Sequence, residues 1–357
     1  MKNKTSLYAI AEIGTNFNKD VKIARDYIFN CKDAGFDAVK FQYLSLKGQY
    51  FDEFYTKETK RLFDVIGFEQ EWLYQFKEFA VEAEIEIGVS PTFDQALEEC
   101  LSADLDFIKI ASPQVFTKPH YIAQAAKSNK KIIASLGYLS WKEILSLIDK
   151  YKSLDNVHYL YCISQYPADI ESFRLDMLSE LISLNNGKIG ISDHWLSNAP
   201  SAIGCYFGAS IVEKHVTFDR LSPGPDHFFA LELDEWKAYV KTMRDSIRMH
   251  DQQIKLLKGN EKISGKRDFS IAIPHAYRSN VTEYAGSKFS LKKGQIISSE
   301  HIIYKRVEFG LKTGFTNSNF LIGKVIDRFG LKIPIIFATF ILVSSYLTAI
   351  ISTEFWH

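Results

Sequence analysis

Two histidines stand at the ends of short β-like runs and are of a residue type that binds metals. His194 comes just after the run Lys188–Ser192, and His215 ends the run Ser210–His215. Strand ends are where α/β folds place their chemistry, so these imidazoles could hold one divalent metal ion through neutral nitrogens. The alternative is that each imidazole forms an ordinary hydrogen bond in a polar loop.

Carboxylates accompany the two histidines in the sequence. Asp193, Glu213 and Asp226 lie close enough along the chain to orient an imidazole or to add an oxygen ligand. Three histidines and four carboxylates fall within one predicted β-α-β unit. This concentration favours a metal site over separate loop hydrogen bonds.

Two lysines end apolar runs elsewhere in the chain. Lys40 lies in DAVKFQ and Lys109 lies in DFIKIAS. A single lysine of this kind could simply extend its ammonium group to water. Two of them, together with hydroxyl groups and a predicted helix start after Ser112, indicate a site for phosphate or carboxylate.

The elements that must position these residues form a repeating pattern. Most of the β-rich runs are followed by an amphipathic segment of helix length, which predicts a parallel sheet, and eight repeats over about 240 residues predict a closed (β/α)8 TIM barrel. An open doubly wound sheet is the alternative, but AEIGTNFN is not the GxGxxG turn of a dinucleotide-binding sheet. The runs are Tyr8–Ile13, Ala38–Gln42, Ile85–Val89, Phe107–Ile110, Lys131–Ala134, Val157–Cys162, Lys188–Ser192 and Ser210–His215.

Every one of these predicted strands ends in polar residues. Because the carboxyl ends of barrel strands converge on one face, we expect these side chains to line a single site. They are Glu12, Asn16, Lys40, Gln42, Ser90, Thr92, Lys109, Ser112, Ser135, Ser164, Gln165, Tyr166, Asp193, His194, Glu213 and His215.

Composition excludes several classes of partner. Lys and Arg total 43, as do Asp and Glu, so no net charge indicates a nucleic-acid partner. The four cysteines form no CxxC pair, which favours a reducing compartment. The first residues lack the apolar region of a secretory signal, so we expect a cytoplasmic protein.

The chain is predicted to hold two domains and a tail. Residues 1–257 form the barrel and end in an amphipathic helix over Leu231–Leu257, 258–267 form a polar linker, and 268–328 form a small, mostly β module. The tail, residues 329–357, contains Ile333–Thr353, which is 21 residues without a charge. That length is sufficient to span a bilayer, and a buried helix is the alternative.

The ordered blocks AEIGTNFN, DAVKFQ, DFIKIAS, SQYP, GISDH, VEKHVTFD and GPDH resemble the sialic acid synthase (N-acetylneuraminate synthase) family. The resemblance runs from about residue 8 to residue 257 and continues more faintly into the β-rich module, which resembles the family's antifreeze-like (SAF) domain. It implies a homodimer in which the SAF domain of one subunit covers the barrel of the other.

The resemblance also implies an activity. Family members condense phosphoenolpyruvate with an open-chain N-acetylmannosamine-type amino sugar to give a nine-carbon 2-keto-3-deoxy acid and phosphate. A divalent metal ion, Mn²⁺ or Mg²⁺, is implied on His194 and His215. Glu12 and Asp226 are implied at the sugar and the reacting carbon. The implied substrate-binding residues are Lys40, Gln42, Lys109, Ser112, Ser135, Ser164, Tyr166 and the lid arginine Arg306.

Several positions depart from the family pattern. Phe17 stands where histidine is usual and Gln165 where asparagine is usual, so we expect an altered polar lining on the sugar side. Leu136 replaces a common threonine, and Val307 and Glu308 replace the proline and glycine after the lid arginine. The resemblance therefore does not determine which amino sugar is used.

Two further functions remain as alternatives. A synthase of legionaminic or pseudaminic acid, or of a spore-coat or capsule sugar, would share the barrel and its blocks. A non-catalytic protein tethered to the membrane by the apolar tail belongs to a different class, although the retained metal and phosphate residues argue against it.

Overall fold

The structure of the chain is a computed structural model. It describes residues 6–185, 187–256, 283–287 and 302–306 of the 357-residue sequence, with side chains up to residue 250. The chain divides into two compact units, one holding the barrel and the other holding two short strands near the C-terminus.

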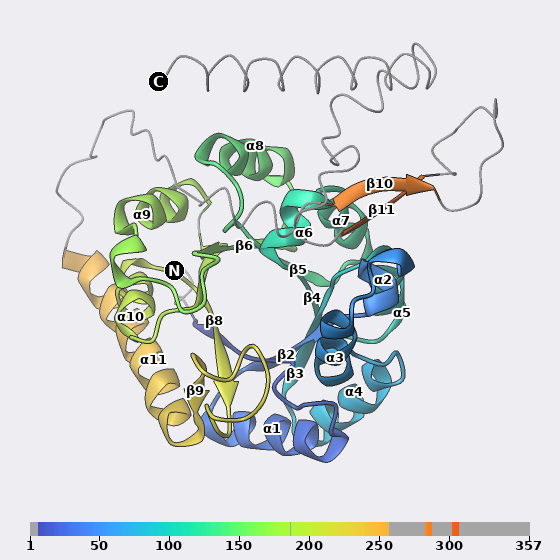
Figure 1. The fold of residues 1–357 in the computed structure, drawn as a ribbon. Helices are drawn as coiled ribbons and strands as arrows, with labels where there is room; N and C mark the ends of the chain where they lie inside the picture. Colours follow the sequence, from blue (N-terminus) through green and yellow to red (C-terminus); the bar gives the residue numbers. More distant parts are fainter. Residues whose placement is uncertain (1–5, 186, 257–282, 288–301, 307–357) are drawn as a thin grey trace, which may run out of the picture. The chain divides into compact units, whose positions relative to one another are not determined.

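Eight parallel strands pair in chain order, and the first also pairs with the eighth, which closes the sheet into a barrel (Figure 1). This confirms the predicted (β/α)8 architecture. A short ninth strand, β9 (Leu231–Glu232), pairs in parallel with the end of β8. The barrel strands are β1 (Tyr8–Gly14), β2 (Ala38–Tyr43), β3 (Glu86–Pro91), β4 (Phe107–Ile110), β5 (Lys131–Ser135), β6 (Val157–Cys162), β7 (Ile189–Asp193) and β8 (Ile211–Thr217).

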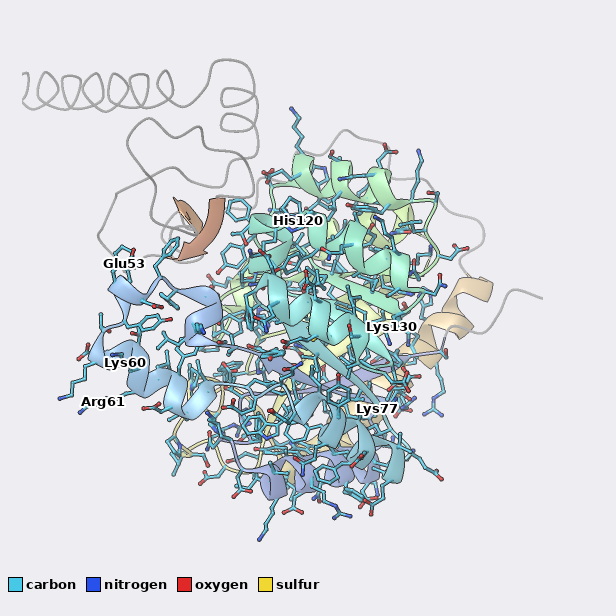
Figure 2. All side chains as sticks on the ribbon, turned by 90° about the vertical axis from the view of Figure 1, so that its right-hand side faces the viewer. Glu53, Lys60, Arg61, Lys77, His120 and Lys130 are labelled. Atoms are coloured by element: carbon cyan, nitrogen blue, oxygen red, sulfur yellow. The ribbon has the colours of Figure 1, made fainter. Side chains whose placement is uncertain are left out.

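Helices surround the ring of strands, and charged side chains such as Lys60 and Arg61 project outward from them (Figures 1 and 2). The α-helices are α1 (Val21–Ala34), α2 (Leu46–Gln49), α3 (Lys57–Ile66), α4 (Trp72–Glu82), α5 (Asp94–Ser102), α6 (Ser112–Thr117), α7 (His120–Ala125), α8 (Trp141–Tyr151), α9 (Leu175–Leu184), α10 (Ala199–Phe207) and α11 (Leu233–Leu256). The 3-10 helices are η1 (Asp52–Phe54), η2 (Ala126–Ser128) and η3 (Ile170–Ser172).

Local sequence signals set several helix ends. Asp20 accepts hydrogen bonds from the first backbone N–H groups of α1, and Gly35 ends that helix with a φ of 94°, which favours glycine. Ser140 and Glu143 form a capping box at the start of α8. These caps fix where each helix begins and ends relative to its strands.

The barrel contains two separate apolar layers. The large one lies between the strands and the helices. The small one fills the barrel itself, because its members alternate along the strands with residues of the large one. It consists of Ile10, Ala38, Phe107, Ile133, Leu160 and Ile211, with Tyr8 packed against it. This inner layer supports the polar residues further along the same strands.

Phe17 packs in an aromatic cluster outside the barrel. Its ring is 2% exposed and meets the rings of Phe41, Trp72 and Phe76 edge to face, with centroids 5.3–5.6 Å apart. Phe41 points away from the interior because it alternates with Lys40, which points inward. The expectation that Phe17 alters the lining of the sugar site is therefore wrong.

The second unit is described only in part. Strands β10 (Glu283–Ser287) and β11 (Ile302–Arg306) pair antiparallel, with Arg306 opposite Glu283. The predicted linker 258–267 and the tail 329–357 lie outside the described residues, so the domain boundaries stay predictions. Among the residues described, no helix is both long and apolar enough to cross a membrane.

Candidate active site

A ring of buried polar side chains lies directly above the inner apolar layer. In six strands the polar residue follows the apolar one by two positions, so both point into the barrel. In β3 and β7 a glycine, Gly88 or Gly190, takes the place of the apolar residue. The polar residue two positions later is Ser90 or Ser192. The ring comprises Glu12, Lys40, Ser90, Lys109, Ser135, Cys162, Ser192 and Glu213, each at most 5% exposed.

Two lysines and two glutamates of this ring form one ionic network. Lys40 Nζ lies 2.6 Å from Glu12 Oε2 and 3.9 Å from Glu213 Oε2, and Lys109 Nζ lies 3.3 Å from Glu213 Oε1. Ser90 and Ser192 complete it, since Lys40 donates to Ser90 Oγ at 3.0 Å and Ser192 Oγ donates to Glu213 Oε1 at 2.8 Å. The structure thus brings the two predicted lysines together.

The two glutamates have opposite pKa shifts. Burial raises the pKa of Glu12 to about 7, and the nearby ammonium group of Lys40 offsets this only in part. Burial also acts to raise the pKa of Glu213, but the ammonium groups of Lys109 and Lys40 outweigh it and hold that pKa at about 2. Glu213 therefore stays ionised, whereas Glu12 can gain and lose a proton near neutral pH.

The two lysines also differ. Burial acts to lower the pKa of Lys40, yet the carboxylates of Glu12 and Glu213 raise it above the usual value. Burial lowers the pKa of Lys109, and Glu213 offsets this only in part. Glu213 is thus the main group that favours the charged form of Lys109.

The two candidate metal ligands lie side by side at the carboxyl ends of β7 and β8. The ring centroids of His194 and His215 are 5.7 Å apart, and the ring of Tyr166 lies 4.1 Å from that of His194. His194 Nδ1 is 2.8 Å from the carbonyl oxygen of Ile163, which can only accept a hydrogen bond. A neutral His194 therefore carries its proton on Nδ1, and its Nε2, which lies 3.3 Å from Ser192 Oγ, is the nitrogen that would bind a metal ion.

The donor set fits a divalent ion with open coordination positions. His215 Nδ1 is buried without a hydrogen-bond partner, and burial, followed by the neighbouring His194, lowers the pKa of His215 well below its usual value. A neutral imidazole is the form that binds metals. Across the side chains described, no group of three or more His, Cys, Asp and Glu is gathered tightly enough to hold a metal ion. The protein would thus supply two imidazoles there, with other positions left to water or substrate.

Asp226 and Glu12 approach the same glycine. A Cβ atom at Gly14, where φ is 59°, would lie 3.2 Å from both Asp226 Oδ2 and Glu12 Oε1. Asp226 accepts a hydrogen bond from Thr15 Oγ1 at 3.4 Å, and Gln42 Nε2 donates to Glu12 Oε1 at 2.7 Å. Burial raises the pKa of Asp226 to about 6. Both predicted catalytic carboxylates and Gln42 therefore lie at one side of the site.

Hydroxyl groups lie on the opposite wall, formed by β4 to β6. Ser112 Oγ accepts a hydrogen bond from the backbone N–H of Gly137 at 3.1 Å. A Cβ atom at Gly137 would come within 2.3 Å of Ser164 Oγ and 3.0 Å of Ser112 Oγ, so only glycine fits between them. Ser135 Oγ is buried and has no hydrogen-bond partner, which makes it available to a ligand.

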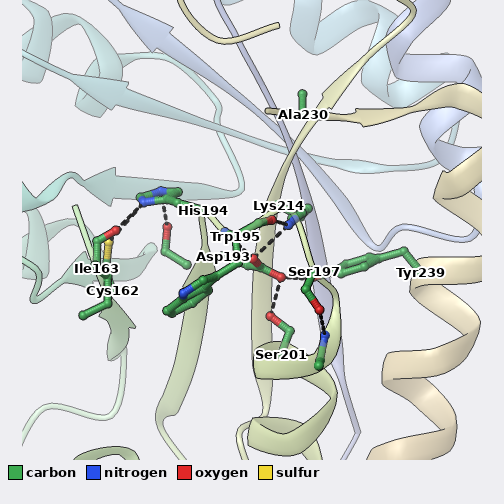
Figure 3. A network of polar contacts seen from close by, with 12 residues as sticks. Cys162, Ile163, Asp193, His194, Trp195, Ser197, Ser201, Lys214, Ala230 and Tyr239 are labelled. Atoms are coloured by element: carbon green, nitrogen blue, oxygen red, sulfur yellow. Dashed lines mark hydrogen bonds and ion pairs between the residues drawn. The ribbon is translucent and has the colours of Figure 1, made fainter. Parts of the chain in front are cut away.

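The carboxylate of Asp193 points away from the two imidazoles that it was expected to orient directly. Ser192 points into the barrel, so the next residue along the strand, Asp193, points outward. It pairs with Lys214 at 2.8 Å and accepts a hydrogen bond from Ser201 at 2.6 Å (Figure 3). The period-two alternation of β7 is the sequence signal that could have shown this.

Glu213 lies in the middle of the ionic network, which the sequence did not suggest. It was expected to orient a histidine, whereas its carboxylate lies between Lys40 and Lys109. The block VEKH could have shown this, because alternation puts Glu213 and His215 on one face of β8 and Lys214 on the other. Arg306 lies in the other unit, at the end of β11, so its role stays a prediction.

Comparison of the sequence with known proteins identifies a family. The model of the NeuB family matches residues 27–255. An uncharacterized protein from Methanocaldococcus jannaschii is 30% identical over 319 residues, which are 86% of this chain and 87% of that protein. N,N'-diacetyllegionaminic acid synthase from Legionella pneumophila is 27% identical over 321 residues, 85% of this chain and 86% of that enzyme.

Solved structures agree with these matches. N-acetylneuraminic acid (sialic acid) synthetase from Leptospira borgpetersenii superposes with a TM-score of 0.61 at 26% identity, covering 74% of this chain and 89% of that chain. A spore coat polysaccharide biosynthesis protein from Bacillus subtilis superposes with a TM-score of 0.67 at 23% identity, covering 84% and 85%, and shows the shared fold. The chain therefore belongs to the NeuB family, the family of sialic, legionaminic and pseudaminic acid synthases.

Proposed function

We propose that this protein condenses phosphoenolpyruvate with an open-chain N-acylated amino sugar and releases phosphate, giving a nine-carbon 2-keto-3-deoxy acid. The observation that carries the proposal is the buried network of Glu12, Lys40, Glu213 and Lys109, which lies next to two neighbouring imidazoles at the ends of β7 and β8. Two ammonium groups suit a substrate with a phosphate and a carboxylate. Two imidazoles suit a metal ion that activates an aldehyde.

Lys40 and Lys109 would bind the anionic groups of phosphoenolpyruvate. Water is excluded from both ammonium groups, whose side chains are 3% exposed, so their attraction for an anion is stronger than at a surface. Ser135 Oγ, buried without a partner, would donate to the same substrate, together with Ser112 and Ser164.

His194 and His215 would hold a divalent metal ion, which we propose to be Mn²⁺. A pair of imidazoles favours a transition metal over Mg²⁺, which prefers oxygen ligands. When bound, such an ion supplies Lewis-acid polarisation of the sugar aldehyde. The protein's own part is to orient the imidazoles, which the hydrogen bond of His194 to the carbonyl of Ile163 supports.

Glu12 would move the proton of the reaction. C3 of phosphoenolpyruvate forms a bond to the aldehyde carbon, whose oxygen takes up a proton. Water adds at C2 and gives up a proton, and the bond from C2 to the phosphate oxygen breaks as the C2 hydroxyl loses its proton to the leaving phosphate and becomes the ketone. These steps need a group that exchanges a proton near neutral pH, and Glu12 has a pKa of about 7. Asp226, with a pKa of about 6, lies beside it and is placed to contact the sugar.

We also propose a cytoplasmic homodimer in which Arg306 of the partner subunit reaches the sugar. None of the chain's four cysteines, all of which lie among the described residues, takes part in a disulfide, which supports a reducing compartment. N-acetylmannosamine is the first sugar to test. Sugars with two acetamido groups are next, because relatives include legionaminic and pseudaminic acid synthases.

The experiment is a search for the keto acid product. The purified protein is incubated with phosphoenolpyruvate, Mn²⁺ and each of several 2-acetamido and 2,4-diacetamido hexoses. The products are identified by their masses in mass spectrometry. We expect a 2-keto-3-deoxy acid with one sugar and none from the variant Lys109→Met. Absence of product with every sugar, from protein that binds phosphoenolpyruvate, would contradict the proposed condensation.

A further inference from the structure

The residues that precede His194 and His215 in sequence form a fully buried ion pair. Lys214 Nζ lies 2.8 Å from Asp193 Oδ1, and the two side chains are 1% and 0% exposed. Asp193 and Lys214 are also register partners, in the last paired rung between β7 and β8. The ion pair therefore joins the two strands at the position just before both histidines (Figure 3).

Lys214 also holds the residue on the other side of His194. Its ammonium group donates to the carbonyl oxygen of Trp195, and the backbone N–H of Trp195 donates to Asp193 Oδ1 at 3.0 Å. His194 thus lies between Asp193, which pairs with Lys214, and Trp195, which hydrogen-bonds to both members of that pair. Lys214 itself is the neighbour of His215. One buried ion pair consequently fixes the backbone on both sides of one imidazole and next to the other.

Stability alone does not explain this pair. Taking two charges out of water is costly, and replacement of a buried ion pair by apolar residues of similar size is often neutral or stabilising. Asp193 receives further hydrogen bonds from Ser201 at 2.6 Å and Tyr239 at 3.4 Å, all outside the barrel interior. These contacts make the carboxylate rigid. The location of the pair, beside two candidate ligands, accounts for it better.

We propose that the Asp193–Lys214 pair is a positioning device that sets the distance between the imidazoles of His194 and His215 and so determines the affinity of the site for a divalent metal ion. The inference rests on the proposed metal role of the two histidines. Metal–ligand distances tolerate deviations of only about 0.2 Å. A turn after β7 that is free to move would therefore weaken binding even if both imidazoles remained present.

The test is a titration of metal-free protein with Mn²⁺, in which free Mn²⁺ is measured by electron paramagnetic resonance. The variants are Lys214→Met and the double variant Asp193→Leu/Lys214→Met. The double variant leaves no unpaired buried charge, so it carries the test if Lys214→Met does not fold. The matched control is Lys77→Met, which removes the ion pair between Lys77 of α4 and Asp106 at 2.9 Å.

We expect the double variant to melt within a few degrees of the wild type and to bind Mn²⁺ about tenfold or more weakly, the usual effect of losing an outer-shell partner. The control should bind Mn²⁺ as the wild type does. Wild-type affinity in the folded double variant would overturn the positioning role while leaving the metal role of the histidines intact. A wild-type protein with no saturable Mn²⁺ site would overturn both.

Discussion

The carboxylate of Glu213 lies 3.3 Å from the ammonium nitrogen of Lys109, and both groups are buried inside the barrel. Burial lowers the pKa of Lys109, and Glu213 is the principal group that opposes this. The carboxylate of Glu213 is therefore the main group that favours the charged form of Lys109. This dependence leads to the first prediction.

Glu213→Gln is expected to weaken phosphoenolpyruvate binding. Without the carboxylate, the pKa of Lys109 falls further, and a neutral amine attracts an anion less. We expect a loss of about tenfold or more that becomes smaller as the pH is lowered, since one pKa unit corresponds to a tenfold change in the charged fraction and a lower pH restores the proton. Isothermal titration calorimetry with phosphoenolpyruvate measures this.

Ser192→Ala is the matched control for that variant. It removes the hydrogen bond from Ser192 Oγ to Glu213 Oε1 but keeps the carboxylate. Its binding should change little and should show no recovery at low pH beyond that of the wild type. Equal losses in the two variants, both independent of pH, would contradict the proposed effect of Glu213 on Lys109.

Removal of either candidate metal ligand is expected to abolish tight Mn²⁺ binding. A lost outer-shell partner costs about 10–100-fold in affinity, and a lost ligand should cost more. We predict that His215→Ala lowers Mn²⁺ affinity by more than about a hundredfold. The control is His158→Ala, a partly buried histidine near the start of β6, which should leave Mn²⁺ binding unchanged. Retained affinity in His215→Ala would remove that residue from the metal site.

Glu12 is expected to make folding stability fall as the pH rises. Burial raises its pKa from 4.5 to about 7 in the folded protein. Between these values the folded protein binds a proton that the unfolded chain has released. The stability contributed by protonated Glu12 is therefore full below about pH 4.5 and is lost as the pH rises through 7.

The variant Glu12→Gln carries no such proton. Relative to the wild type, its free energy of unfolding should increase between about pH 5 and pH 8, by up to about 3 kcal/mol. Urea denaturation of metal-free protein at the two pH values measures the difference. A difference that does not change with pH would show that the folded pKa of Glu12 is not raised.

Phe17 is expected to matter for stability rather than for sugar choice. Its ring is buried among Phe41, Trp72 and Phe76, outside the barrel interior. Truncation of a buried phenylalanine costs about 3–5 kcal/mol. We predict that Phe17→Ala lowers the melting temperature and leaves the relative rates with different amino sugars unchanged. A changed sugar preference would place Phe17 at the substrate after all.

The sequence predicted the barrel and most of its polar layer for a simple reason. Strand alternation and strand ends are local patterns, so the eight strands were placed to within two residues, and Lys40 and Lys109 were expected in one site. Contacts between side chains of different strands are not local. The position of Glu213 between the two lysines depends on how far each strand is shifted along its neighbours. The direction of Phe17 depends on the loop after β1, which no periodic pattern describes.

The measurement that tests the central claim most directly is phosphate release from phosphoenolpyruvate. Inorganic phosphate is followed with and without an amino sugar and with and without added Mn²⁺, using protein freed of metal by a chelator. The account predicts release that needs both the sugar and the metal ion, one phosphate for each molecule of keto acid formed. Release without any sugar, or no release with every sugar despite bound phosphoenolpyruvate and Mn²⁺, would contradict it.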